Sequence, residues 1–168
     1  MNPAAILYYP DPRLKVECSR VRVIDEETKK IVEILRLTFF SERGLGLAAP
    51  QIGISQRICV VAHPDYIREG VEKANVYINP QIVEQEGEFI SREGCLSLPG
   101  LWRDVRRYQK VKVEAFDLSG QAFLYEAEDM YAACLQHEID HLDGVLFVDR
   151  LSQMRRKRAL KQFVKRGR

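Results

Sequence analysis

The sequence predicts an α+β fold, because segments with helical periodicity enclose a series of short apolar segments bounded by turn residues. The chain has 168 residues, of which 46% are hydrophobic, and this is enough for one compact domain with a single core. It contains no internal repeat and no long linker, so we expect one domain over residues 1–168. The N-terminus lacks the basic or Arg-rich patterns that are typical of export and transit signals.

The first predicted helix begins after Asp25, whose side chain can cap it, and ends near Arg43, where glycines follow. Apolar residues recur at helical spacing along this segment: Ile24, Ile31, Leu35 and Phe39. Residues 57–62 and 76–78 are short apolar runs and are predicted to be strands.

Residues 111–117 and 121–127 predict a β-hairpin, since a Leu-Ser-Gly turn separates them. Asp129 is a candidate cap for a second helix that runs to about Leu142, with Gly144 just past its end. A third helical pattern reaches the C-terminus through Leu151, Met154, Leu160, Phe163 and Val164. In this last helix we expect Leu160, Phe163 and Val164 to form the packed stripe.

The charge is distributed unevenly. Residues 155–168 form a basic C-terminal helical tail with eight Lys or Arg residues and no acid, so the other residues hold 18 basic and 24 acidic side chains. An acidic body with a basic tail predicts a polyanionic partner for the tail, although a solvated helix end also explains the charge. Four cysteines lie far apart with no C-x-x-C pair, which favours packing or metal ligation in a reducing cytosol over disulfides.

The strongest local motif is His137-Glu138-Ile139-Asp140-His141. On a helix, residues four apart lie on one face, so both imidazoles can reach one metal while Glu138 lies beside it. A catalytic metal site needs a third protein ligand and an open position. Both familiar zinc-protease patterns fail here, because Phe147 occupies the third-histidine position and no glutamate follows Glu138.

The third ligand therefore comes from upstream, and the candidates are Cys95, His63 or a carboxylate. Residues 93–100 surround Cys95 with glycines and a proline, which indicates a bent segment that can present a thiolate and free N–H groups. Taken alone, a single cysteine is more often a small buried packing residue than a ligand. Residues 44–53 lack any phosphate-loop pattern and favour a sheet edge, with the amide of Gln51 at its end.

Three segments together, G-L-G-L-A-A-P-Q, E-G-C-L-S and Q-H-E-I-D-H, closely resemble peptide deformylase in their order and spacing. The resemblance covers nearly the whole chain, and the compact length and helical tail look most like the type 1 bacterial subgroup. It implies a fold of mixed or antiparallel sheets around a central metal-binding helix, with N-terminal and C-terminal helices. Residues 100–103 lie in a region that differs among members, which leaves the outer substrate groove undefined.

The resemblance implies that Cys95, His137 and His141 bind one divalent metal ion. Fe(II) is then the expected native metal, and zinc, nickel or cobalt can occupy the same site. Asp140 is expected to orient one of the ligand imidazoles.

The implied activity is hydrolysis of the N-formyl group from N-formylmethionyl nascent polypeptides, with release of formate. Glu138 is the expected general base, and Gln51 and the Leu96 backbone N–H are the expected oxyanion donors. Gly46 is grouped with these catalytic residues. The expected substrate-binding residues are Gly44, Leu45, Gly46, Glu93, Met130, Ala133 and Cys134. Of these, Met130, Ala133 and Cys134 precede His137 at helical spacing on the ligand-bearing face, where they can hold the methionine side chain.

The expected partners are formylmethionyl peptides and, through the basic tail, the ribosome near its exit tunnel. Neither a membrane nor DNA is expected as a partner, and the predicted location is the bacterial cytoplasm. Two other hypotheses remain open at this point: a zinc endopeptidase, and a catalytically silent RNA-binding protein with a structural metal.

Overall fold

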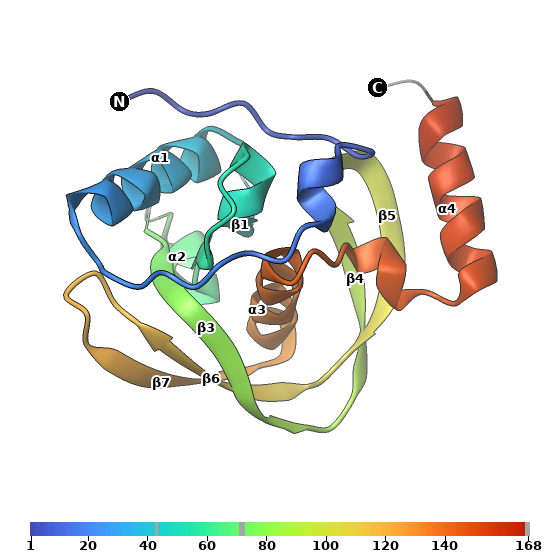
Figure 1. Ribbon diagram of the computed structural model, residues 1–168. Helices are drawn as coiled ribbons and strands as arrows, with labels where there is room; N and C mark the ends of the chain where they lie inside the picture. Colours follow the sequence, from blue (N-terminus) through green and yellow to red (C-terminus); the bar gives the residue numbers. More distant parts are fainter. Residues whose placement is uncertain (43, 71–72, 167–168) are drawn as a thin grey trace.

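The computed structural model describes residues 1–168 except residue 43, residues 71–72 and residues 167–168. Two sheets and four α-helices make up this described part of the chain, so the predicted α+β class is confirmed (Figure 1). The helices are α1 (Glu26–Glu42), α2 (Pro64–Glu69), α3 (Asp129–Leu142) and α4 (Gln153–Lys165). The strands are β1 (Gly46–Ala48), β2 (Ile58–Val61), β3 (Asn75–Glu86), β4 (Phe89–Cys95), β5 (Leu98–Arg107), β6 (Lys110–Phe116) and β7 (Ala122–Glu128).

The larger sheet is antiparallel and has the strand order β1-β2-β3-β6-β7. The predicted strands at residues 57–62 and 76–78 are confirmed as β2 and β3, although β3 continues to Glu86. The glycine-rich segment is a sheet edge as predicted, because β1 pairs with β2 alone among the described strands. The smaller sheet contains only β4 and β5.

The predicted hairpin is confirmed as β6 and β7. The Asp117 carboxylate closes its turn by accepting hydrogen bonds from the backbone N–H groups of Ser119 (2.8 Å) and Gln121 (3.0 Å). Gly120 adopts a φ of +82°, a conformation that glycine reaches without strain.

The hairpin of β4 and β5 was not predicted, and neither was the short helix α2. Leu98, Leu101 and Val105 are buried on β5 but recur three and four residues apart, which resembles a helical period. Polar and charged residues interrupt β4, and the buried Arg107 of β5 has no apolar character. Period-two alternation therefore does not mark either strand.

Helix α1 begins as predicted, because Asp25 Oδ1 accepts a hydrogen bond from the Thr28 N–H (3.0 Å). Its apolar face, with Ile31, Leu35 and Phe39, is buried against β1 and β2. The far side of this helix faces solvent, which is the arrangement expected of an amphipathic surface helix.

Helix α3 lies at the centre of the molecule, between the larger sheet and the hairpin of β4 and β5 (Figure 1). One of its faces, with Leu135, Ile139 and Leu142, packs on the larger sheet. The prediction that Asp129 caps this helix is wrong. Asp129 is the first helical residue, and its carboxylate accepts a hydrogen bond from the Gln109 side chain at 3.1 Å instead.

The end of α3 is set by Gly144, as predicted. Its φ is +69°, and its N–H donates to the His141 carbonyl at 3.1 Å while the Val145 N–H donates to the Asp140 carbonyl at 2.9 Å. A Cβ at position 144 would lie 2.7 Å from the carbonyl of Lys15. The glycine therefore lets the N-terminal segment cross closely over the C-terminal end of α3.

Helix α4 packs along β5 (Figure 1), where Ala159 and Phe163 are buried in one cluster with Leu98 and Leu101. The prediction that Val164 belongs to the packed stripe is wrong, because its side chain is 69% exposed. Neighbouring helical residues are about 100° apart, so Val164 turns away when Phe163 faces the core. No described helix is both long and apolar enough to cross a membrane.

Candidate metal centre

Helix α3 and the end of β4 bring together three side chains of the types that bind metal ions. The ligand atoms of Cys95, His137 and His141 all lie within 4.8 Å of one another. The Cys95 sulfur is 3.3 Å from Nε2 of His141. Of the upstream candidates, the structure thus selects Cys95. His63 lies elsewhere, and its Nδ1 accepts a hydrogen bond from the Asp65 N–H (3.2 Å).

A buried ion network orients His137. Its Nδ1 is 2.9 Å from Oε2 of Glu93, so a proton on Nδ1 leaves Nε2 free to bind a metal. Glu93 in turn accepts two hydrogen bonds from Arg107, at 2.7 and 2.9 Å. The same guanidinium donates to Asp140 at 2.7 Å, which connects both strands of the small hairpin to α3.

Two predictions about this network need correction or refinement. Asp140 does not contact an imidazole; it bonds Arg107 and Arg150, so it acts on His137 only through Arg107 and Glu93. Glu93 was expected to bind substrate, and the structure uses both of its carboxylate oxygens for Arg107 and His137. Arg107 was not predicted at all, because one arginine in a basic strand carries no signal of burial.

The ionisation of Glu93 depends on these partners. Burial alone raises the pKa of a carboxyl group, but the hydrogen bonds from Arg107 and His137 outweigh it and lower the pKa of Glu93 to about 2. The carboxylate is therefore charged at neutral pH, as the opposing guanidinium requires.

Glu138 is almost fully buried beside the two histidines, and its Oε2 has no hydrogen-bond partner among the described residues. Burial raises the pKa of this carboxyl group to about 7. The space that it occupies depends on Gly46, since a Cβ at that position would lie 2.5 Å from Oε1 of Glu138. Because Gly46 of β1 has no side chain, the Glu138 carboxylate can occupy this space.

Gln51 is held in one orientation. Its Oε1 accepts a hydrogen bond from the Ala48 N–H (2.9 Å), so its Nε2 points toward Ser97 Oγ (3.2 Å) and the Cys95 sulfur (3.6 Å). This places an amide donor beside Cys95, which is the neighbourhood that the resemblance implied for Gln51. Ser97, which supports the amide, was not predicted.

A cavity of about 440 Å³ opens beside the cluster. It is lined by Gln51, Leu96, Cys95, His137 and Glu138 together with all of the expected substrate-binding residues: Gly44, Leu45, Gly46, Glu93, Met130, Ala133 and Cys134. Leu45 and Met130 are about half exposed, at 43% and 52%, so they border solvent as well. Position 102, in the variable segment, also lines the cavity.

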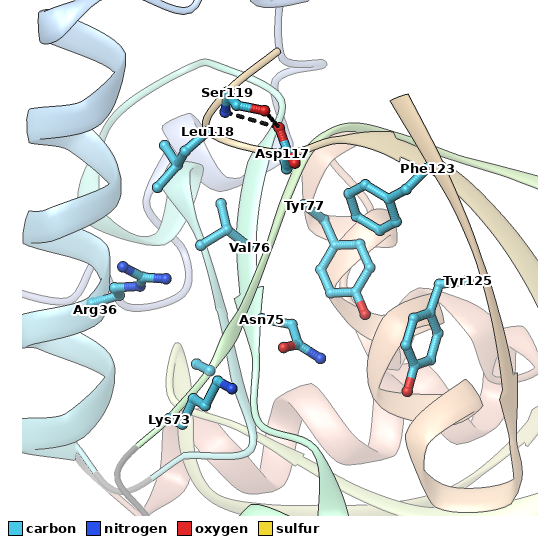
Figure 2. Close-up of a pocket in the computed structure, with 11 residues that line it drawn as sticks. Arg36, Lys73, Asn75, Val76, Tyr77, Asp117, Leu118, Ser119, Phe123 and Tyr125 are labelled. Carbon is cyan, nitrogen blue, oxygen red and sulfur yellow. Dashed lines mark hydrogen bonds between the residues drawn. The ribbon is translucent and has the colours of Figure 1, made fainter. Parts of the chain in front are cut away.

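A second cavity of about 430 Å³ shares none of these residues (Figure 2). It lies between Arg36 of α1, the start of β3 and the turn after β6, and Tyr77, Phe123 and Tyr125 line one side of it. None of the predicted metal-binding or catalytic residues borders it. The predicted catalytic and substrate-binding residues therefore line the first of these two cavities and not the second.

Comparison with known proteins gives one consistent result. A family model described as polypeptide deformylase matches residues 3–157. The peptide deformylase of Alkalilimnicola ehrlichii is 43% identical over 166 residues, which cover 97% of this chain and 92% of that protein. The peptide deformylase of Thermomicrobium roseum is 48% identical over 153 residues, covering 90% and 87% of the two chains.

Two solved structures have the same fold. The crystal structure of a peptide deformylase from Legionella pneumophila matches with a TM-score of 0.89 and 42% identity, and the match covers 97% of this chain and 94% of that one. The Ehrlichia chaffeensis peptide deformylase, solved in complex with actinonin, matches with a TM-score of 0.90 and 36% identity over 100% and 99% of the two chains.

The first prediction concerns the thiolate ligand. Cys95→Ser should lower metal affinity more than about 100-fold, beyond the range typical of changes outside the ligand set, because a hydroxyl is a much poorer donor than a thiolate. Metal content after gel filtration checks this. Cys134→Ser, in the wall of the same cavity, is the matched control and should retain its metal. Full metal content in Cys95→Ser would contradict the assignment.

The second prediction concerns Glu93 in the metal-free protein. Its folded pKa of about 2 lies below the ordinary value of 4.5, so its contribution to stability is present above pH 4.5 and is lost as the pH falls toward 2. This difference corresponds to about 3 kcal/mol at neutral pH. Glu93→Gln should therefore lower the free energy of unfolding by roughly this amount at pH 7.

Urea unfolding at several pH values measures this difference, which should shrink as the pH approaches about 2. Glu88→Gln is the control, because Glu88 pairs with Arg106 on the same hairpin at 3.1 Å but is exposed. An exposed pair of this kind contributes about 0–1 kcal/mol. Equal effects of the two substitutions would show that the buried network is not stabilising.

Proposed function

The chain belongs to the polypeptide deformylase family, and from this premise we propose how its own residues remove the N-formyl group from N-formylmethionyl polypeptides. The observation that carries the proposal is the convergence of one thiol and two imidazoles next to the buried, unpartnered Oε2 of Glu138. A closed structural site needs four protein ligands, whereas three converge here among the described residues.

The donor set fits a catalytic transition metal, with Cys95, His137 and His141 as ligands. When bound, a divalent ion supplies a Lewis acid that polarises the formyl carbonyl and lowers the pKa of water. Fe(II) is our proposal for the native ion, and zinc, nickel or cobalt suit the same mixed ligand set. The Glu93 carboxylate keeps His137 in the tautomer that this role requires.

Glu138 moves the proton. In the proposed reaction it takes a proton from the attacking water and returns it to the departing amine nitrogen, so the products are formate and a free α-amino group. A base whose pKa is close to the working pH serves both transfers, and burial raises the pKa of Glu138 to about 7. Gly46 contributes by leaving the space that this carboxylate fills.

The developing oxyanion is stabilised by two donors in this proposal, the Nε2 group of Gln51 and the backbone N–H of Leu96. The Ala48 N–H fixes the amide of Gln51 before substrate arrives. Such a donor needs no reorganisation when charge develops, which is the source of its effect on the rate.

The methionine side chain is proposed to enter the cavity between Leu45 on one wall and Met130, Ala133 and Cys134 of α3 on the other. The peptide that follows it can pair with the free edge of β1 as an added strand. Because main-chain pairing ignores side chains, one site can accept many nascent sequences. In this proposal Glu93 lines the cavity and positions His137.

The proposed partner of the basic tail is ribosomal RNA near the exit tunnel, where nascent chains emerge in the bacterial cytoplasm. Exposed cations on the outer side of α4 support this: Lys157, Arg158, Lys161 and Lys165. The acidic remainder of the chain makes this helix the natural contact for a polyanion.

The third prediction tests the reaction itself. Wild-type protein loaded anaerobically with Fe(II) should release formate from formyl-Met-Ala-Ser, and Glu138→Ala should lower kcat/KM by about 10²–10⁴-fold while it keeps its metal. A formate assay and metal analysis check both statements.

The matched control is Glu128→Ala, just before α3, because Glu128 is exposed and forms only a surface pair with Lys110. Cleavage of internal bonds in an unformylated peptide would favour the endopeptidase hypothesis. Absence of formate above a metal-stripped control would favour a catalytically silent protein.

The fourth prediction concerns the tail. Truncation at Met154 would remove the buried Ala159 and Phe163, so the cleaner change is substitution by Gln of four of the exposed cations, Lys157, Arg158, Lys161 and Lys165. This variant should lose ribosome co-sedimentation and keep its formate release on short peptides. Wild-type binding should weaken steeply between about 50 and 200 mM salt. Binding of the cations releases counterions from the RNA, and a higher salt concentration opposes that release. Binding that is unaffected by the Gln substitutions and by the higher salt concentration would show that the tail is a solvated helix with no role in ribosome binding.

A further inference from the structure

Trp102 is a large apolar side chain that the reaction chemistry does not use. It lies on β5, lines the cavity beside the metal cluster, and is 54% exposed. Its indole rests on the backbone of Gly94, since a Cβ at position 94 would lie 2.9 Å from two atoms of the ring. One face of the ring is therefore covered by β4, and the side chain remains open to the cavity and to solvent.

The strand beneath this side chain is held firmly. Leu101, the preceding residue, is buried against Ala159 and Phe163 of α4. The Arg103 guanidinium donates to the Trp102 carbonyl at 2.7 Å and also to the Gln162 side chain of α4. Helix α4 thus fixes the backbone on both sides of Trp102, and Gly94 limits the movement of its ring.

An extended substrate passes this position. If the methionine side chain lies between Leu45 and α3, the next residues advance by about 3.3 Å each along the groove, and their side chains alternate between two faces. One of the first two residues after methionine then projects toward the wall that carries Trp102, and its neighbour projects away.

We propose that Trp102 is a specificity-determining residue, whose indole binds an apolar or aromatic side chain at one of the first two substrate positions after formylmethionine. This rests on the proposed deformylase function. Contact with the half-exposed ring removes apolar area from water on both partners and allows ring stacking. Glycine offers no such contact at this position, and aspartate adds a charge that must lose hydration.

The kinetic test uses two peptide series, formyl-Met-X-Ser and formyl-Met-Ala-X, with X as Phe, Leu, Gly or Asp. For one series, wild-type kcat/KM should be about threefold to tenfold higher with Phe than with Gly, mainly through KM. In Trp102→Ala this ratio should fall toward one, and Trp102→Phe should retain part of it. Ile90→Ala is the matched control, because Ile90 is 61% exposed on the same hairpin but does not line the cavity.

A binding measurement gives a second readout, because Trp102 is the only tryptophan of the chain. The zinc-loaded Glu138→Ala protein should change its tryptophan emission when formyl-Met-Ala-Phe or formyl-Met-Phe-Ser binds, according to which position meets the ring. The corresponding Gly peptide should bind with a much smaller change. Calorimetry on the same samples shows that both peptides are bound.

The outcomes separate this inference from the function on which it rests. No formate from any peptide would overturn the proposed function. Formate release with the same Phe-to-Gly ratio in wild type and Trp102→Ala would overturn only the role of Trp102. Equal Trp102-dependent preference at both positions would also contradict the inference, because neighbouring side chains of an extended peptide cannot face the same wall.

Discussion

The buried guanidinium of Arg107 is the interaction on which the site depends. It lies between the carboxylates of Glu93 on β4 and Asp140 on α3, and thereby joins the strand that carries Cys95 to the helix that carries both histidines. A buried charge is costly unless it is paired and hydrogen-bonded, so each of these groups requires the others. The network also orients the His137 imidazole, so the arrangement of Cys95, His137 and His141 follows from the same contacts that hold the hairpin to the helix.

Two glycines, which have no Cβ, allow close approaches between segments of the chain around α3. Gly46 leaves room for the Glu138 carboxylate, and Gly144 lets the chain near Lys15 cross over the end of α3. Gln51 is positioned by a hydrogen bond instead. Its Oε1 accepts from the Ala48 N–H, so its Nε2 faces the Cys95 sulfur. The Glu138 carboxylate therefore depends on a glycine at position 46, and the Gln51 amide depends on a backbone hydrogen bond.

Helix α4 both supports β5 and carries the basic surface charge. Its buried side supports β5, which carries both Arg107 and Trp102, and its exposed side carries the basic charge. A partner bound to the basic side would contact the same helix that holds the wall of the substrate groove. The tail is thus part of the framework of the site as well as a charged surface.

Elements with strong local signals could be predicted from the amino-acid pattern: the capped helix after Asp25, the hairpin around Gly120, and the helix on which His137 and His141 share a face. The family resemblance also came from the amino-acid sequence, because the three motifs consist of glycines, prolines and residues with reactive side chains in a fixed order. The motifs also implied that Cys95 joins the two histidines, and the structure brings these three side chains together. The burial of Arg107 and the bonds of Asp140 to arginines instead of an imidazole became visible only in the folded structure. These facts depend on contacts between residues far apart in the chain, and periodicity carries no information about which charged side chain of a strand will find a buried partner.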